Sequence, residues 1–527
     1  MNQIRKAFQA RRKSLKFHEA VMVPELLLLY FVGMSGEELL VIAMVCRAWS
    51  LVALDLYWST NYASLSMLAM RLIHTRQPLA RGTRRVFEER RPIESFKQHP
   101  STSRDIHPDD WSYFLHLAQK IGRLRISVIP DHVFTNKLQK EIVFGSNPIF
   151  PQLKSLYLNV ESFFGVKWSP LLSLILTPTI DTLDVIGGID SMNLVNIVTF
   201  QAISVAKRIQ NLGVSGPLLP LLLQPPSNEL QQLTILRLHR FNPGVLHEIA
   251  HLPNLVELYF ENYLSSTKHR ISLAGDIILP ALEILSFDGE NTTPHLRVHI
   301  FIEIVMPRLH TLILRPYLKW EYADTAGILL LEERSPLLKR FDVGWGSGPG
   351  PSIWPLGSLT NTLLRFTQLR EIKIETHESD TMLYEGYVAW FVEHLPLLES
   401  LVLAPVDPEK LGAFTEKVLV EFTAFPTVLK HLDIPLNLST IDQVYLSAIP
   451  PEHETASTLR SFRARPLILS GKQIGEAARF LAAWCPNVKD WGLRLKFVDV
   501  AQPAKAKRFE EAFWTGLRGL PHGSGLT

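Results

Sequence analysis

Two histidines with a glutamate between them are the residues of this 527-residue chain whose types and spacing most suggest chemistry. His247, Glu248 and His251 follow the H-E-x-x-H spacing, which places two imidazoles on one helix face, where they can hold zinc beside a general base. A zinc hydrolase also needs a longer helix, a third ligand and an open cleft, whereas Pro253 ends any helix two residues later. We therefore predict an exposed helix without a metal, and a hydrolase is the alternative.

A glycine-rich stretch, residues 344–350 (GWGSGPG), follows an expected strand, as phosphate-binding loops do. It lacks the Lys-Ser/Thr pair of a nucleotide-binding loop, and Pro349 and Pro351 oppose a helix that would receive a phosphate. We predict a flexible loop. The alternative is a peptide-contact loop that carries Trp345 and Trp354.

Composition also argues against catalysis. No Ser-His-Asp or Cys-His arrangement can be assigned, and the chain has only two cysteines, Cys46 and Cys485, which are far apart. Such usage is typical of a reducing compartment and excludes a cysteine-based zinc site. We expect two structural cysteines, no enzyme activity, no cofactor and no metal.

Charge and hydropathy restrict the partners. The 54 Lys+Arg nearly balance the 51 Asp+Glu, and a formal net charge of +3 implies no general attraction to nucleic acid or membranes. No apolar run approaches the ~18–20 residues of a membrane span. We expect a protein of the cytoplasm, the nucleus or both, with protein partners and neither nucleic acid nor membrane.

One apolar phrase, L-x-x-L-x-L, returns along most of the chain, usually with a proline two residues before it. Between Ile126 and Leu493 we count fourteen copies, spaced by about 28 residues, which is the range of leucine-rich repeats. The least regular copies are at 209–214 and 459–464. Clear copies are Leu255/Leu258/Phe260, Leu282/Leu285/Phe287, Leu309/Leu312/Leu314, Leu338/Phe341/Val343 and Leu398/Leu401/Leu403.

The phrase predicts an α/β fold. Its three apolar residues point into a core and the residues between them point out, so neighbouring units must stack as parallel strands to bury their apolar sides. Helical stretches such as 387–394 and 474–484 separate the strands. We predict an irregular leucine-rich-repeat solenoid, a horseshoe with a parallel concave sheet, over residues 109–500. A capping helix at 109–121, whose exposed amides Asp109 or Asp110 would cap, opens it, and a C-terminal helix or tail (501–527) follows.

The N-terminal part has a different composition. Residues 1–16 form a basic tail, predicted to be disordered, with a nuclear signal or an Arg-rich transit segment as alternatives. Residues 17–72 read as a module of three short helices that is too apolar to bury its own surface. Within it, Ser35 and Glu38 have capping-box spacing, whereas Gly36 weakens that helix start. Residues 73–108 read as a partly disordered linker.

This module resembles an F-box. The resemblance rests on Val23-Pro24-Glu25-Leu26-Leu27, Phe31, Glu38-Leu39, Val45-Cys46-Arg47-Ala48-Trp49 and Trp58. With the repeats behind it, the chain resembles F-box proteins with leucine-rich repeats of the fungal type. The residues that the resemblance assigns to adaptor binding are Pro24, Glu25, Leu26, Leu27, Phe31, Leu39, Val45, Cys46, Arg47, Trp49 and Trp58.

The resemblance implies a substrate-recognition subunit of an SCF-type cullin-RING ubiquitin ligase. The F-box would dock on a Skp-family adaptor, and the repeats would bind a target protein. The alternative is a non-catalytic repeat scaffold whose F-box-like segment serves another partner.

A target would bind to the outward positions of the strands. The middle repeats offer an acidic cluster with one aromatic residue, and the late repeats offer a basic cluster that suits a phosphorylated target. The candidate residues are Arg237, His239, Glu257, Tyr259, Glu261, Arg463, Arg465 and Arg494.

Overall fold

The computed structural model describes residues 24–43, 47–74, 106–127, 134–138, 140, 148–163, 168–215, 230–240, 246, 249–261, 277–289, 300–301, 304–316, 322–344, 356–376, 386–405, 414–423, 428–439, 441, 458–485, 487–498 and 503–519. The predicted basic tail and most of the predicted linker lie outside these residues. The chain divides into two compact units, residues 1–215 and 216–527.

The described part of unit 1 begins with the helices α2 (Pro24–Phe31), α3 (Gly36–Ala43) and α4 (Arg47–Thr60). The predicted capping box of α3 is present, because the Ser35 amide donates to the Glu38 carboxylate (2.8 Å) and the Glu38 amide donates to the Ser35 hydroxyl (3.4 Å). The Ser35 hydroxyl also donates to this carboxylate (3.0 Å), and the hydrogen bonds from the Ser35 amide and hydroxyl lower the pKa of Glu38. Gly36 has a packing role as well, since a Cβ there would lie 2.7 Å from Oδ1 of Asn61.

The chain passes from α4 directly into the repeat sheet. Strand β1 (Tyr62–Ser64) pairs in parallel with β2 (Arg123–Ile126), and Ala63 opposite Leu124 is buried. The helix α5 (Leu65–His74) follows β1. The solenoid therefore begins inside the segment predicted as an all-helical module (17–72) and not at residue 109, because this short strand takes the free edge of β2.

Direct contacts fix the end of α4 to the start of β2. The Trp58 carbonyl accepts a hydrogen bond from the Gly122 amide (3.2 Å), and the Lys120 ammonium lies 2.6 Å from the Asp55 carboxylate. A Cβ on Gly122 would lie 2.6 Å from the Ser59 carbonyl oxygen. Only glycine therefore allows this close approach between the two backbones.

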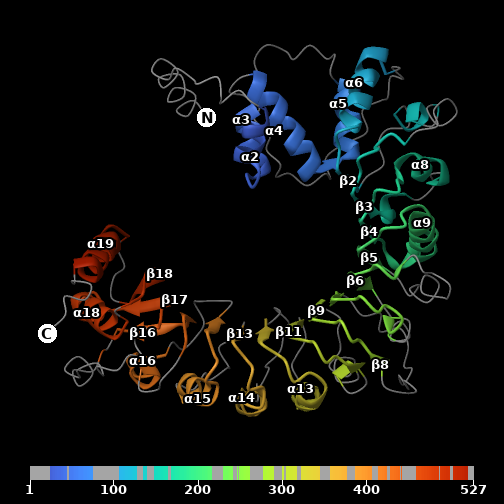
Figure 1. The fold of residues 1–527 in the computed structure, drawn as a ribbon. Helices are drawn as coiled ribbons and strands as arrows, with labels where there is room; N and C mark the ends of the chain where they lie inside the picture. Colours follow the sequence, from blue (N-terminus) through green and yellow to red (C-terminus); the bar gives the residue numbers. More distant parts are fainter. Residues whose placement is uncertain are drawn as a thin grey trace, which may run out of the picture. The chain divides into compact units, whose positions relative to one another are not determined.

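The rest of unit 1 follows the predicted pattern of strands and helices. Its strands pair in parallel in the order β1-β2-β3-β4-β5. Helices α8 and α9 lie along one side of the strands (Figure 1). The other elements of unit 1 with described bounds are α6 (Pro108–Ala118), β3 (Ser155–Asn159), η3 (Val160–Phe163), α8 (Trp168–Ile175), β4 (Thr182–Ile186), η4 (Ile189–Ser191), α9 (Met192–Val205) and β5 (Asn211–Ser215).

The predicted capping helix is α6. Its Trp111 and Phe114 are buried and pack with the rings of Phe134 and Phe150, so the helix closes the apolar interior of the first repeats. The predicted cap is wrong, because the side chain of His107 accepts the hydrogen bond from the Asp109 amide (3.3 Å).

Unit 2 holds one parallel sheet in the order β6-β7-β9-β11-β12-β13-β14-β15-β17, and both β16 and β18 pair with β17. A separate two-stranded sheet joins β8 (Ile277–Ile278) and β10 (Ile304–Val305). The strands of the main sheet are β6 (Ile235–Arg240), β7 (Glu257–Phe260), β9 (Ile284–Gly289), β11 (Thr311–Pro316), β12 (Arg340–Val343), β13 (Glu371–Thr376), β14 (Ser400–Pro405), β15 (His431–Asp433), β16 (Leu436–Leu438), β17 (Ser461–Leu469) and β18 (Asp490–Phe497).

The helices of unit 2 lie along one side of this sheet (Figure 1). The helices with described bounds are α13 (Tyr322–Arg334), α14 (Leu356–Leu363), α15 (Gly386–His394), α16 (Glu416–Thr423), α18 (Ile474–Trp484) and α19 (Pro503–Gly519). The predicted helices at 387–394 and 474–484 are confirmed as α15 and α18. The C-terminal α19 packs against α18 with Phe513 and Leu517 buried, so it covers apolar surface at the last repeat.

Every predicted copy of the phrase forms a strand of the sheet, including the two least regular copies, which form β5 and β17. The middle apolar residues of successive phrases lie opposite one another, as Leu285 and Leu312, Leu312 and Phe341, and Phe341 and Ile372 do. These side chains are almost completely buried. Register, repeat length and one-sided helices together define an α/β solenoid of leucine-rich repeats.

The join between α4 and the sheet leads to a first prediction. Gly122→Ala should lower the free energy of unfolding by about 1–3 kcal/mol, because the new methyl group collides with a backbone carbonyl that cannot rotate away. Urea unfolding measures the loss. Gly475→Ala is the control, since a Cβ there meets no atom within 4 Å and should be neutral or stabilising. Equal stability of Gly122→Ala and wild type would contradict the described packing.

Candidate protein-binding faces

The predicted adaptor residues fall into two groups, and the first belongs to the interior of the N-terminal module. Leu27, Phe31 and Leu39 are each no more than 3% exposed and form its core together with Ala53. The Trp49 ring packs edge-on against Phe31, with centroids 5.8 Å apart. These side chains hold the helices together, and Leu27, Phe31 and Leu39 have almost no surface to offer a partner. Their assignment as contact residues is corrected accordingly.

The second group comprises the predicted adaptor residues that are not part of this core. Pro24, Glu25 and Leu26 form the first turn of α2, and Arg47 begins α4. Val45 and Cys46 lie outside the described residues. Trp58 is half-buried, and its ring meets that of Tyr57 where α4 reaches the sheet. Trp58 thus lies at the junction with the repeats.

The exposed apolar surface of the module lies on residues that the resemblance does not assign to adaptor binding. In α2 and the turn after it, Leu29, Tyr30 and Val32 are 73%, 74% and 62% exposed. Sequence reasoning missed them because α2 is apolar on all sides, so periodicity cannot separate its buried face from its exposed one. We call the full set the α2–α3 apolar face: Leu28, Leu29, Tyr30, Val32, Met34, Leu40 and Val41.

The second candidate face is the outward side of the unit 2 sheet, opposite its apolar core. In the middle repeats the Arg237 guanidinium lies 5.1 Å from the centroid of the Tyr259 ring, and the Tyr259 hydroxyl donates to Glu257 (2.7 Å). His239 hydrogen-bonds Glu261. The structure therefore brings all five middle candidates together on β6, β7 and the residue after β7. Tyr259 pairs with Glu257 and His239 pairs with Glu261, while Arg237 stacks on the Tyr259 ring.

Burial and the hydrogen bond to Glu257 raise the pKa of Tyr259 to about 12. Burial also raises the pKa of Asp288 in β9, against the opposing effect of Arg315 on the neighbouring strand. The outward face is thus polar but partly desolvated, which strengthens its electrostatic interactions relative to those in bulk water.

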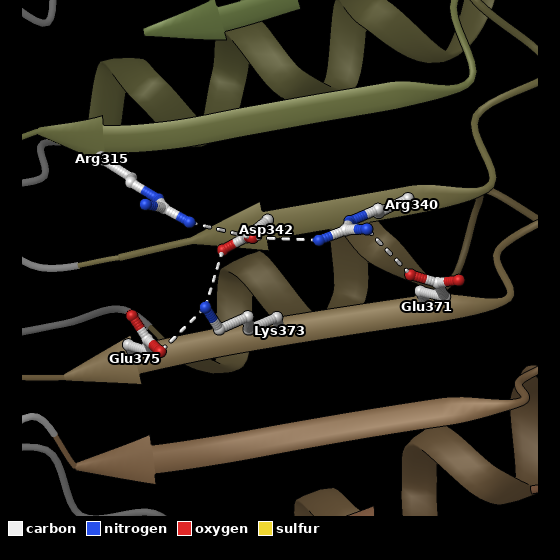
Figure 2. A network of polar contacts seen from close by, with 6 residues as sticks. All are labelled: Arg315, Arg340, Asp342, Glu371, Lys373 and Glu375. Atoms are coloured by element: carbon white, nitrogen blue, oxygen red, sulfur yellow. Dashed lines mark ion pairs between the residues drawn. The ribbon is translucent and has the colours of Figure 1, made fainter. Parts of the chain in front are cut away.

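An ionic network that the sequence did not predict surrounds Asp342 on the same face (Figure 2). The side chain of Asp342 is 1% exposed, and among the described residues neither of its carboxylate oxygens accepts a hydrogen bond. Cations from three strands surround it: Nη2 of Arg315 and of Arg340 lie 3.5 Å away, and Nζ of Lys373 lies 3.9 Å away. The side chains of Arg315 and Arg340 are 45% exposed and that of Lys373 is 30% exposed, so the cations contact solvent while Asp342 does not.

Two further carboxylates complete this network. Glu371 lies 3.4 Å from Arg340, and Glu375 lies 2.9 Å from Lys373 (Figure 2). Outward alternation along β12 could have placed Asp342 on the open face, but only the strand register shows that three cations converge on it.

The predicted late basic cluster is only partly formed among the described side chains. Arg463 in β17 pairs with Asp490 of β18 at 3.4 Å, so its charge is offset. Arg494 is exposed in β18, and Arg465 lies in β17, where its side chain is not described. The expectation of a phosphate site there gains no support from these contacts.

The motifs that suggested chemistry lie largely outside the described residues. His247, Glu248 and residues 345–355 lie outside the described residues, and His251 is exposed. In the part of the chain that the structure describes, no group of three potential ligands could hold a metal ion. Cys485 is buried, which raises the pKa of its thiol to about 12.

No helix within the described ranges has both the length and the apolarity to cross a membrane.

Comparison with solved structures finds leucine-rich-repeat proteins. LegL7 from Legionella pneumophila is 12% identical over 75% of this chain and 98% of its own (TM-score 0.29), and the repeat domain of APL1B is 14% identical over 74% and 78% (TM-score 0.23). A TLR13–ssRNA13 complex is 15% identical over 73% of this chain, with a TM-score of 0.32. The match spans only 44% of the TLR13 chain.

No protein-family model and no curated protein matches the sequence. Likeness to solved structures at such low identity carries no functional information. The fold assignment therefore rests on the strand register, and function must be argued from the two faces.

The Asp342 network gives a second prediction. Asp342→Asn keeps the shape but leaves three cations facing one another, so we expect a loss of about 1–3 kcal/mol in unfolding free energy, below the ~3–5 kcal/mol of a fully buried pair. Denaturant unfolding would measure it. Glu332→Gln, which removes an exposed pair with Arg365, should cost no more than about 1 kcal/mol. Similar losses in both variants would refute a special role for Asp342.

The raised pKa of Tyr259 gives a third prediction. Because the folded pKa lies above the ordinary value, its contribution to stability is present below about pH 10 and is lost as the pH rises towards about 12. The phenolate absorbance of wild type minus that of Tyr259→Phe should therefore rise with a midpoint near 12. A midpoint near 10 would show that the phenol is neither desolvated nor bonded to Glu257.

Proposed function

We propose that this protein is a substrate-recognition subunit of an SCF-type cullin-RING ubiquitin ligase. Its N-terminal helices dock on a Skp-family adaptor, and its repeats hold a target protein on the outward face of the sheet. The chain itself performs no chemical step in this role and needs no cofactor. Such a receptor works in the cytoplasm or the nucleus, where ubiquitin ligases meet their targets.

The observation that carries the proposal is the α2–α3 apolar face. Its seven residues are exposed beside a core formed by Leu27, Phe31, Leu39 and Ala53, so their apolar surface is available to a partner. Burying one Leu or Val side chain is worth roughly 1.5–3 kcal/mol, so a few of them suffice for a stable helix-on-helix contact. The F-box resemblance supplies the kind of partner, a Skp-family adaptor.

The junction between α4 and the sheet supports the same role. Because α4 leads into β1 and hydrogen-bonds Gly122, the adaptor-binding module and the first repeat move together. A receptor must hold its target at a defined place relative to the ligase, and within unit 1 this junction joins the docking module to the first repeat without a flexible hinge at the end of α4.

The alternative function is a repeat scaffold whose N-terminal module serves a different partner. The same apolar face supports it, since apolar exposure identifies a contact surface but not its occupant. Adaptor binding distinguishes the two.

The proposal predicts capture by a co-expressed Skp-type adaptor. Leu29→Ser/Tyr30→Ser should reduce capture at least tenfold, because both side chains are exposed and lie in the proposed contact. The control is Ile197→Ser/Phe200→Ser, which removes two comparably exposed apolar residues from α9 and should leave capture unchanged. Circular dichroism of both variants serves as the control for folding.

Two outcomes would overturn the proposal. Absence of capture by soluble wild-type protein would favour the scaffold alternative. Equal loss in both double variants would indicate non-specific adhesion of apolar surface.

A further inference from the structure

A row of mostly basic residues runs across the unit 2 sheet at the end where its strands begin. Each occupies the position directly before a strand, and the backbone links them: the amide of Arg370 donates to the carbonyl of Lys339, that of Arg460 to Lys430, and that of Lys489 to Arg460. Glu399 joins Arg370 to Lys430 through the same kind of bond, and beyond Lys339 the ladder continues to His310 and Glu283 of earlier repeats. We call this the strand-start row, and its members are Lys339, Arg370, Glu399, Lys430, Arg460 and Lys489.

Positive charge dominates this row. It contains five cations and one carboxylate, and Glu399 is neutralised on both sides by Arg370 (3.1 Å) and Lys430. The Lys430 hydrogen bond lowers the pKa of Glu399, so this residue remains ionised and pairs with its neighbours. Lys339, Arg460 and Lys489 are exposed and have no ion pair among the described residues. These three cationic groups are therefore available to bind an anionic partner.

Exposed aliphatic side chains accompany the cations. Leu337, Leu397 and Val428 each lie two residues before a member of the row and are exposed by 48%, 37% and 42%. These three residues lie in the segments that lead into the strands, so they lie beside the strand-start row. This end of the sheet is amphipathic, with charge and apolar surface side by side.

The fold does not require these cations. Exposed cations near helix C-termini are worth only about 0.3–1 kcal/mol each, and exposed ion pairs contribute a similar amount. Within the strands of the same repeats, the outward residues carry charges of both signs, as in the Asp342 network. The strand-start row instead carries a clear excess of positive charge. The asymmetry favours a ligand over a stabilising role.

We infer that the strand-start row binds an acidic polypeptide segment that also carries leucine-like side chains. Strands lie about 4.8 Å apart, so the five intervals from Lys339 to Lys489 span about 24 Å. An extended chain rises about 3.3 Å per residue, and about seven or eight residues cover that length. Acidic residues pair with the cations, and apolar residues cover the aliphatic side chains.

Nucleic acid and membrane fit the row less well. Its members and the three aliphatic residues include no aromatic side chain on which a base could stack. Membrane surfaces are usually anchored by Trp, Tyr or Phe, which are also missing from this set. An acidic peptide needs neither feature.

The inference rests on the proposed role of the repeats as the target-binding part, but it does not depend on adaptor docking. The test therefore uses the full chain without adaptor. The probe is a fluorescent peptide of alternating glutamate and leucine, and binding is followed by anisotropy at low and high salt. Wild type should bind it, and binding should weaken as salt rises.

Matched variants locate the site. Arg460→Glu/Lys489→Glu should raise the dissociation constant at least tenfold. Lys207→Glu/Arg208→Glu changes the net charge by the same amount at exposed positions in unit 1 and should have little effect. Leu337→Asn/Leu397→Asn should abolish the preference for the glutamate–leucine peptide over polyglutamate while polyglutamate still binds. Thermal melts establish that each variant is folded.

Several results would overturn the inference. They are equal losses in the two charge-reversal variants, no binding of the peptide by folded wild type, or tighter binding of anionic vesicles or a single-stranded oligonucleotide than of the peptide. Retained adaptor capture in the same preparation separates failure of the row from failure of the proposed function.

Discussion

The structure depends on one constraint: each strand can bury its apolar side only if the next strand repeats the same phrase in the same register. Leu312 meets Leu285 on one side and Phe341 on the other, and all three are fully buried. A slip of one residue would turn every apolar side chain outward. The core therefore fixes the inward positions of every repeat and leaves the outward ones unconstrained.

The candidate binding faces occupy positions that this constraint leaves free. On the open side of the sheet, Asp342 gathers cations from three strands, while the end where the strands begin carries the basic strand-start row. At the start of the solenoid the same pairing rule has another effect. Tyr62–Ser64 pair with β2 as strand β1. Because β1 directly follows α4, this pairing attaches α4 and the helices packed on it to the first repeat.

The sequence predicts the repeats well, because a phrase that recurs about every 28 residues shows which residues face inward. It predicts the N-terminal faces poorly. Since α2 is apolar on every side, no pattern shows that Leu27 is buried and Leu29 exposed. A three-residue strand such as β1 lacks a recognisable phrase. Two of the three ion pairs of Asp342, those with Arg315 and Lys373, join residues about 30 positions apart, so they become visible only with the register of the sheet.

The central claim is that the N-terminal helices present an apolar face to an adaptor while the repeats remain free for a target. Amide hydrogen exchange of the full chain, with and without a Skp-type adaptor, tests it most directly. The account predicts slower exchange within residues 24–43 and unchanged exchange in the strands of unit 2. Slower exchange in those strands, with residues 24–43 unaffected, would contradict it.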